Sequence, residues 1–513
     1  MNSKKVYLAM VFVAILLSIS QPGCGHDKDD NNNQGNDMFA EFNNYAVKAM
    51  NDWQVPGMAV AIVQGNTVLF QKAYGVKKMD GADPVTLNTL FQIGSASKSF
   101  TTTLMAMDVS EGKYKWNDKV ITHLPDFQMF DPWVTSEFQV VDLSAQHSGM
   151  PSYAADGAMV LGFDRAHIRH VIRYVKPIYS FRTTGTYVNN LFMVDGALVE
   201  KYSGKSWEDN IRERIFTPLG MTHSSMDRDS FINAPDVANL HHRIGERVVP
   251  LPMDWKFMNW PYNAGPAGGI NSNIIDMVNY VRLHFNNGSF NGRQLIKEEN
   301  AIFVHSPKTI GRPVPNQPMA YYCQGWQYRE YNPHAIIWHN GETSGIKSIV
   351  AFMPEAKLGI VVLTNLDGTK VPESLAWKFF DLYFGHPARD WSAEELEKAK
   401  KARAQEEANR PTPPPDPEPP LSLDKYEGTY YNPVYEEVQV TRQMDQLLVT
   451  VGPLQANIFL RNWDGNTFMG SWDTFTVIED IGLVSFEVNG AGVPVKMTIN
   501  YLNDDGCGVF QRI

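Results

Sequence analysis

Cysteine is scarce in this chain: its 513 residues include only Cys24, Cys323 and Cys507. Three cysteines exclude a disulfide framework and a cysteine-based zinc site. Cys323 and Cys507 lie far apart in the sequence, and each is typical of a small residue packed in an apolar core. We therefore expect two buried free thiols rather than a bridge between them.

The chain also lacks an excess of positive charge. It has 45 Lys and Arg against 56 Asp and Glu, a net charge of −11, and no basic cluster is interleaved with aromatic residues. A nucleic-acid backbone needs such a surface, so nucleic acid is excluded as a partner. His167 and His170 have the spacing of a metal-binding pair, but no third ligand is evident beside them. We expect neither a metal nor another cofactor.

The N-terminal segment has the pattern of a targeting signal rather than of a folded element. Two lysines precede an apolar stretch over residues 6–18, and small residues lead to Cys24. Gly23-Cys24 and the polar spacer after it resemble a bacterial lipoprotein signal, although Gln21 stands where that pattern favours leucine. The resemblance implies a lipid on Cys24 and a membrane-attached protein of the bacterial cell envelope, facing the periplasm or the cell surface. An uncleaved anchor and simple secretion are the alternatives.

Length and composition predict at least two globular units. A chain of 513 residues exceeds an ordinary single domain, and 43% hydrophobic residues are enough for substantial cores. The expected parts are a signal over 1–24, a polar spacer over 25–39, a large α+β domain over 40–390, a charged and proline-rich linker over 391–420 and a small all-β domain over 421–513. The prolines of the linker favour a semi-rigid extended spacer.

Strand patterns predict an antiparallel sheet in the large domain and a barrel in the small one. Residues 57–63 and 68–70 flank a Gln-Gly-Asn turn, which is typical of a β-hairpin. Late strands over 335–338, 346–352 and 359–363 can join this hairpin in one sheet, with helices packed on its faces. The strands expected in the small domain are 428–431, 438–440, 447–451, 457–460, 475–478, 483–488, 495–499 and 508–513. So many short strands favour a small closed barrel.

A hydroxyl and an amine three positions apart form the most informative local pattern. Ser95 follows a strand-like run and Gly94, and an amphipathic helix pattern comes next, so Ser95 and Lys98 are expected on one helix face. The Ser95 N–H would stay free to bind an anion. The same S-x-x-K spacing recurs at Ser110, Ser344 and Ser422. Those copies lack the strand, glycine turn and helix, so we predict that Ser95 is the nucleophile and that Lys98 belongs to its base.

Tyr187 and Asn189 can extend this site. A lysine deprotonates serine only if its own pKa is lowered, so a second polar group is expected near Lys98. Tyr187 and Asn189 come just before a helix-like run over 191–202. The phenol can share the proton of the lysine, and the amide can donate to a substrate carbonyl.

His339 and Gly341 form the third element, in an H-x-G motif on a late strand. Alternation along a strand places both residues on one side. Gly341 would let substrate backbone approach closely, and the Glu342 N–H could pair with the Ser95 N–H as an oxyanion hole. The Glu342 carboxylate would disfavour an anion there, but alternation predicts that it points away.

The order of these motifs and several further stretches carry a resemblance. The accompanying stretches are 143–151, 218–221, 266–272 and 361–365. Over residues 40–385 the chain resembles the serine beta-lactamase and penicillin-binding protein superfamily, in its class C-like branch with D-alanyl-D-alanine carboxypeptidases, D-aminopeptidases and esterases. The fold implied is an antiparallel sheet with helices on both faces plus a helical subdomain. Residues 426–430 resemble the lipocalin-like barrel often appended to these hydrolases.

The resemblance implies a role for each matching residue. Ser95 would be acylated, with Lys98 and Tyr187 as the base pair, and Asn189 would orient the substrate. His339 would replace the lysine of the K-T-G motif, which supplies a fixed positive charge. Because a histidine is mostly neutral at pH 7, ester or D-peptide hydrolysis is favoured over strong beta-lactam hydrolysis.

Two functional classes follow. The first is an exported serine hydrolase that forms an acyl-enzyme with a small-molecule or peptide substrate: a peptide containing D-residues, an ester or an amide. The second is a non-catalytic penicillin-binding or peptidoglycan-sensing protein on the same fold; a weak beta-lactamase is a further alternative. The substrate itself and a homo-oligomeric state are left open.

Two other groups are expected to be structural. His147 matches a loop of the family and is predicted to support that loop. The aromatic residues Trp255, Phe257, Trp260 and Tyr262 are predicted to pack under a loop rather than to line a pocket.

Overall fold

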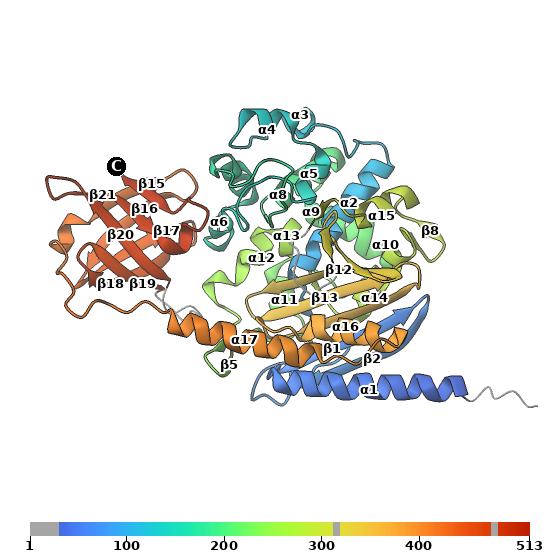
Figure 1. The fold of residues 1–513 in the computed structure, drawn as a ribbon. Coiled ribbons are helices and arrows are strands. Elements are labelled where there is room, and N and C mark those ends of the chain that lie inside the picture. Colours follow the sequence, from blue (N-terminus) through green and yellow to red (C-terminus); the bar gives the residue numbers. More distant parts are fainter. Residues whose placement is uncertain (1–29, 311–318, 473–480) are drawn as a thin grey trace, which may run out of the picture.

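A large α+β domain and a separate β-barrel make up the protein (Figure 1). The structure is a computed structural model that describes residues 30–310, 319–472 and 481–513. The predicted signal and the lipidation site at Cys24 lie outside these residues. Within them, no helix is both long and apolar enough to cross a membrane.

An antiparallel sheet forms the centre of the large domain. In spatial order its strands are β2 (Thr67–Gly75), β1 (Gly57–Gln64), β14 (Leu358–Thr364), β13 (Ile346–Met353), β12 (His334–Thr343), β11 (Gln327–Tyr331), β10 (Ala320–Tyr322) and β9 (Thr309–Ile310). The predicted early hairpin is confirmed as β1 and β2, and β1 pairs with β14 from the far end of the domain. The predicted strand over 335–338 is longer than expected, so the H-x-G motif lies within β12.

Helices cover both faces of this sheet, which confirms the predicted fold class. On one face lie α1 (Asp30–Asp52) and α16 (Val371–Phe384), followed by α17 (Trp391–Ala408). On the other lies α14 (Ile274–Phe285), with α2 (Ser97–Ser110) beyond it. Every residue of β13 and β14 is buried, because both faces of these strands are covered.

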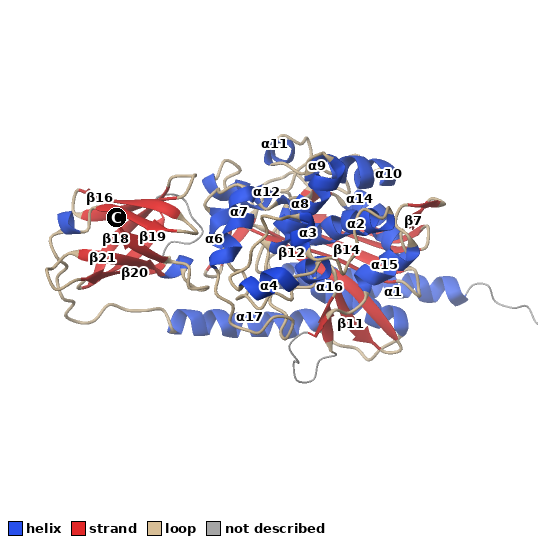
Figure 2. Cartoon of the chain, turned by 90° about the horizontal axis from the view of Figure 1, so that it is seen from above, coloured by secondary structure: helices blue, strands red, loops and turns tan. Residues whose placement is uncertain are grey.

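A helical subdomain fills the sequence between the hairpin and the late strands. Its helices include α3 (Val120–His123), α4 (Pro132–Glu137), α5 (Val140–Ser144), α6 (Asp156–Val160), α7 (Arg165–Val171), α8 (Leu191–Ser203), α9 (Trp207–Ile211), α10 (Thr217–Leu219), α11 (Arg228–Ile232), α12 (Trp260–Asn263), α13 (Gly265–Gly268) and, after α14, α15 (Glu298–His305). The predicted helix over 191–202 is confirmed as α8. Figure 2 shows α6, α7 and α12 on the side of the large domain that faces the barrel, and α10 and α15 on the opposite side.

The described part of the small domain is a closed barrel, as predicted. Its strands are β15 (Gly428–Asn432), β16 (Glu436–Gln443), β17 (Gln446–Val451), β18 (Ala456–Asp464), β19 (Thr467–Trp472), β20 (Gly482–Val488), β21 (Pro494–Ile499) and β22 (Val509–Arg512). The sequence pattern missed β19, and the strand expected over 475–478 lies outside the described residues. Cys323 and Cys507 are buried and free, as expected.

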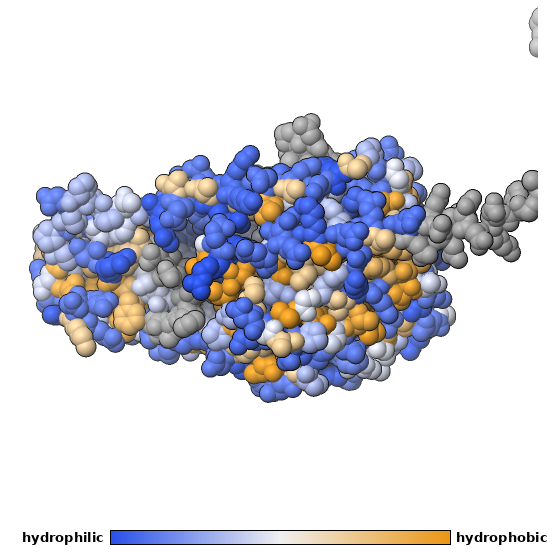
Figure 3. Space-filling model, turned by 90° about the horizontal axis from the view of Figure 1, so that it is seen from below, coloured by the Kyte–Doolittle hydropathy of each residue, from blue (hydrophilic) through white to orange (hydrophobic). Residues whose placement is uncertain are grey.

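The connection between the domains begins as a helix. The first residues of α17, Trp391 and Ser392, are buried against the large domain, although the predicted linker began at 391. Residues 410–420 then form no helix or strand. The face of the molecule shown in Figure 3 carries several separate hydrophobic patches among hydrophilic residues.

Two glycines let β12 pack against the turn that precedes α2. Gly94 has a φ of +52°, and a Cβ there would lie 2.6 Å from the Glu342 backbone nitrogen. At Gly341 a Cβ would lie 1.8 Å from the Ile93 carbonyl oxygen. The close approach at Gly341 is thus made by the chain itself, where the sequence suggested substrate backbone. The contact places the turn carrying Ser95 directly beside β12.

Gly341→Ala should destabilise the large domain by about 1–3 kcal/mol, because the methyl group overlaps a backbone carbonyl that cannot move alone. Urea unfolding of the two purified proteins measures the difference. Gly268→Ala is the matched control, since its added Cβ comes no closer than 4.0 Å to the Pro261 carbonyl oxygen. Equal unfolding midpoints for both variants would contradict the packing argument.

Candidate active site

Ser95 lies in the short 3-10 turn Gly94–Ala96, which leads directly into α2. Lys98 is in the first turn of α2, and its Nζ donates to the Ser95 Oγ at 3.0 Å. The predicted shared face is therefore present, although the turn is tighter than an α-helix. Because α2 is buried along most of its length, the pair is held by the core of the domain.

The Lys98 amine is fully buried in largely apolar surroundings. Besides Ser95, its Nζ donates to the Ala267 carbonyl oxygen at 2.9 Å, and it lies 4.8 Å from the ring centre of Tyr187. Burial disfavours the ammonium and lowers the pKa of Lys98 to about 7, while the nearby Asp156 carboxylate opposes this shift. Near neutral pH a large fraction of the amine is thus unprotonated and able to accept the Ser95 proton.

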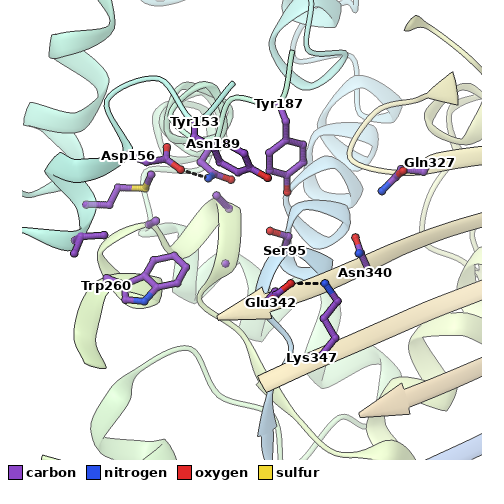
Figure 4. Close-up of a pocket in the computed structure, with 15 residues that line it drawn as sticks. Ser95, Tyr153, Asp156, Tyr187, Asn189, Trp260, Gln327, Asn340, Glu342 and Lys347 are labelled. Atoms are coloured by element: carbon purple, nitrogen blue, oxygen red, sulfur yellow. Dashed lines mark hydrogen bonds and ion pairs between the residues drawn. The ribbon is translucent and has the colours of Figure 1, made fainter. Parts of the chain in front are cut away.

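Tyr187 comes just before α8, and its hydroxyl points toward Ser95 (Figure 4). Burial raises the pKa of the Tyr187 phenol well above its ordinary value, Tyr322 adds to this rise, and the hydrogen bond with Ser95 opposes it. A phenol with so high a pKa stays protonated at neutral pH. Lys98 is therefore the better base of the predicted pair, and Tyr187 is suited to donate and relay a proton.

Asn189 lines the same pocket, with its side chain oriented by a carboxyl group that the sequence did not single out. The Asn189 Nδ2 donates to the Asp156 Oδ2 at 2.5 Å. Burial raises the pKa of Asp156 to about 7, and the bond from Asn189 and the charge of Lys98 oppose that rise. Asp156 is the first residue of α6, a helix of five residues that is too short to show a helical period, so no sequence signal marked it.

His339 occupies the predicted position on β12, but its ring is only 1% exposed. Its Nε2 lies 3.2 Å from the Tyr322 hydroxyl, and its ring packs against those of Tyr322 and Tyr187. Burial, with a smaller effect of Lys98, lowers the pKa of His339 to about 3. The imidazole is therefore neutral, and it carries no charge for a substrate carboxylate.

The edge of β12 faces the pocket. β11 pairs with β12 only as far as Trp338, so residues 339–343 are paired with β13 alone. The Glu342 backbone lies against the Gly94 turn, which brings the two predicted oxyanion-hole residues, Ser95 and Glu342, side by side. A substrate carbonyl lying between this edge and Ser95 can meet both backbone N–H groups.

The prediction that the Glu342 side chain points away from the site is only partly correct. It lies on the face of β12 opposite His339, as alternation predicted, but at this free edge its carboxylate still lines the pocket. It forms an ion pair with Lys347 of β13, its cross-strand neighbour, and accepts from the Gly368 N–H at 2.8 Å. These contacts hold the pKa of Glu342 below its ordinary value.

Lys347 is a second pocket residue that the sequence analysis set aside, since it closes the S-x-x-K copy that begins at Ser344. Its ammonium is buried between Glu342 and Glu373, and these carboxylates raise its pKa despite the burial. The Ser344 Oγ accepts from the Trp260 Nε1 at 3.2 Å. The S-x-x-K copy at Ser344 thus contributes a charged residue, Lys347, to the wall of the pocket rather than a nucleophile.

The pocket formed by these residues has a volume of about 520 Å³. Figure 4 shows Ser95 at its centre, with Tyr153, Tyr187, Asn189 and Asp156 on one side and Glu342 and Lys347 on the other.

Trp260 also lines the pocket, which differs from the expectation of packing alone, whereas Phe257 packs on Trp472 of the barrel. His147 pairs with Asp142 and lies outside the pocket lining, as a structural residue would.

The sheet, the helical subdomain and the serine beside a lysine amine are together typical of serine hydrolases of the beta-lactamase fold. The family model described as Beta-lactamase matches residues 42–380, and the chain belongs to that family. A second model, a domain of unknown function called DUF3471, matches residues 412–506 and so covers most of the barrel.

The chain is also similar to named proteins and to a solved structure. Unguisins hydrolase ungD' of Aspergillus campestris (strain IBT 28561) is 28% identical over 436 residues, covering 79% of this chain and 78% of the relative. Protein flp of Staphylococcus aureus (strain NCTC 8325 / PS 47) is 25% identical over 325 residues, covering 62% and 61%. The octameric penicillin-binding protein homologue from Pyrococcus abyssi has a TM-score of 0.59 and 21% identity over 90% of this chain and 97% of its own; it shows the shared fold.

Labelling of Ser95 by a small fluorophosphonate should depend on pH through Lys98. Only the free amine can accept the serine proton, so the rate should fall about tenfold per pH unit below the Lys98 pKa of about 7 and level off above it. Asp156→Asn removes a carboxylate that favours the ammonium, so the midpoint should move to lower pH. A flat profile between pH 5 and 9, or a midpoint near 10, would contradict the assignment of Lys98.

Proposed function

We propose that this protein is an exported serine hydrolase that forms an acyl-enzyme on Ser95. The observation that carries the proposal is the buried Lys98 amine at 3.0 Å from the Ser95 Oγ, with a pKa lowered to about 7. The hydrolase name of the Aspergillus relative supports hydrolysis in general. Family membership and the pocket around Ser95 support a substrate that contains a carbonyl group.

The reaction starts when the Lys98 amine takes the proton of the Ser95 hydroxyl. The oxygen attacks the substrate carbonyl, and the developing oxyanion is stabilised by the N–H groups of Ser95 and Glu342. Lys98 then returns the proton to the leaving alcohol or amine through Tyr187. Water, deprotonated by the same amine, attacks the ester on Ser95, releases the acid and regenerates the free hydroxyl.

The charges of the pocket favour esters, amides or peptides containing D-residues over beta-lactams. A beta-lactam presents a carboxylate, and a site for it needs an available cation. His339 is neutral and buried, and the Lys347 ammonium is already paired with Glu342 and Glu373. Asp156 adds a further acidic group to the lining. A neutral substrate avoids the repulsion that a carboxylate would meet here.

The alternative is a penicillin-binding or peptidoglycan-sensing protein that is acylated without turnover, and a weak beta-lactamase is a third reading. We also propose attachment to the bacterial cell envelope through a lipid on Cys24, as the N-terminal pattern predicts. A homo-oligomer is compatible with the octameric state of the Pyrococcus abyssi neighbour.

Substrate preference can be tested with a panel of D-aminoacyl p-nitroanilides, short-chain p-nitrophenyl esters and a chromogenic cephalosporin. We expect kcat/KM for the best ester or D-aminoacyl amide to exceed that for the cephalosporin by about 100-fold or more, since a carboxylate lacks a free cation. The reverse order would refute the argument that a neutral His339 disfavours beta-lactam substrates. Acylation without turnover of any substrate would favour the sensor.

Ser95→Ala should abolish labelling by the fluorophosphonate and lower ester turnover by at least about 1,000-fold, because it removes the hydroxyl to which the Lys98 Nζ is hydrogen-bonded. Labelled protein is measured by intact mass and by peptide mapping. Ser422→Ala, which removes an exposed serine with the same S-x-x-K spacing, is the matched control and should behave as wild type. Labelling that survives Ser95→Ala would refute the hydrolase assignment.

A further inference from the structure

The barrel packs directly on the segment that forms one wall of the pocket. Figures 1 and 2 both place α6 beside the barrel, and Tyr153, Asp156, Met159 and Val160 from this segment line the pocket. The surfaces fit closely: a Cβ at Gly157 would lie 2.8 Å from the Tyr435 hydroxyl oxygen of the barrel. The barrel is therefore in contact with the substrate site through this short segment.

One polar bond across this contact joins the pocket wall to the barrel. The Ala155 N–H donates to the Asp505 Oδ2 at 2.6 Å, across 350 positions of sequence. The other oxygen of Asp505 accepts from the Cys507 N–H at 2.9 Å, which fixes the carboxylate within its own turn. Ala155 is fully buried, so loss of this acceptor would leave its N–H without a partner away from water.

The wall needs such an anchor because its backbone is strained. Tyr153 has a φ of +63° and Ala155 a φ of +54°, in the left-handed region that side chains with a Cβ rarely adopt. Such residues persist only when their surroundings fix them. At one end the Tyr153 N–H donates to the Tyr187 carbonyl oxygen at 2.7 Å; at the other the anchor is Asp505.

We propose that Asp505 is a positioning residue for the substrate pocket, and that the barrel serves the site by holding the wall over 153–156 in its strained shape. This inference rests on the proposed hydrolase function for its kinetic consequence. The wall presents Tyr153 to the substrate and places Asp156 where it orients the Asn189 amide. Because Tyr153 lines the same pocket as Ser95, we expect a bulky acyl group on Ser95 to depend on this wall more than an acetyl group does.

Hydrogen exchange of the full-length protein tests the anchor without any turnover. Asp505→Asn keeps an oxygen for one of the two N–H groups and removes the acceptor of the other. We expect amides of a peptide over 153–162 to exchange at least about tenfold faster than in wild type, with the barrel strands unchanged. Asp504→Asn, at the exposed neighbouring residue, is the matched control. Unchanged exchange over 153–162 in Asp505→Asn overturns the proposal.

Steady-state kinetics test the role in binding. For Asp505→Asn we expect KM for a p-nitrophenyl ester with a bulky aromatic acyl group to rise about fivefold or more, while KM for p-nitrophenyl acetate and both kcat values stay within about twofold. An equal change for both esters, or none, overturns the positioning role. If wild type hydrolyses neither ester, the proposed function has failed, and the exchange experiment still decides whether Asp505 holds the wall.

Discussion

The amine of Lys98, buried with no carboxylate bonded to it, is the interaction on which the site depends. Its hydrogen bonds go to two neutral oxygens, on Ser95 and Ala267, so the ammonium form loses its hydration with little compensation. The core around α2 thus makes a base out of a residue that water would keep protonated. Lys347, equally removed from water, has the opposite pKa direction because two carboxylates adjoin it. One pocket therefore holds a lysine for proton transfer and a lysine for charge balance.

Backbone packing then determines where the other groups lie. Gly94 and Gly341 allow the nucleophile turn and β12 to touch, and this contact brings the Glu342 N–H beside Ser95. The same strand carries His339 into an aromatic cluster with Tyr187 and Tyr322, where it is neutral. One strand, β12, thus supplies both the Glu342 N–H at the pocket edge and the buried His339 ring that packs against Tyr187.

Local patterns predicted the elements around the nucleophile, although they missed β19 and the helix α17, and the family resemblance predicted how the elements assemble. The turn at Gly94, the helix after it and the early hairpin follow from glycine placement and apolar spacing, and Ser95, Tyr187 and Asn189 meet in one pocket. Asp156 could not be predicted, because it reaches the site from the first position of α6, a helix too short to leave a periodic pattern in the sequence. Lys347 ends the S-x-x-K copy that begins at Ser344, so the sequence did mark it. Its role as the partner of Glu342 depends on the register between β12 and β13, which the sequence pattern does not determine. For Glu342, strand alternation predicted the correct face of β12. It did not predict that the carboxylate still reaches the pocket, because β12 has a free edge there.

The bond between Ala155 and Asp505 spans 350 positions, and this distance has a consequence for folding. Contacts of such separation form late, since the chain between them must first lose its freedom. The sheet and α2 can assemble from residues before 390, but the wall beside Ser95 lacks its acceptor until the barrel has closed and docked. Maturation of the pocket is therefore tied to the folding of a domain whose described residues do not line it, and a partly folded chain holds the nucleophile and base before it holds a shaped substrate site.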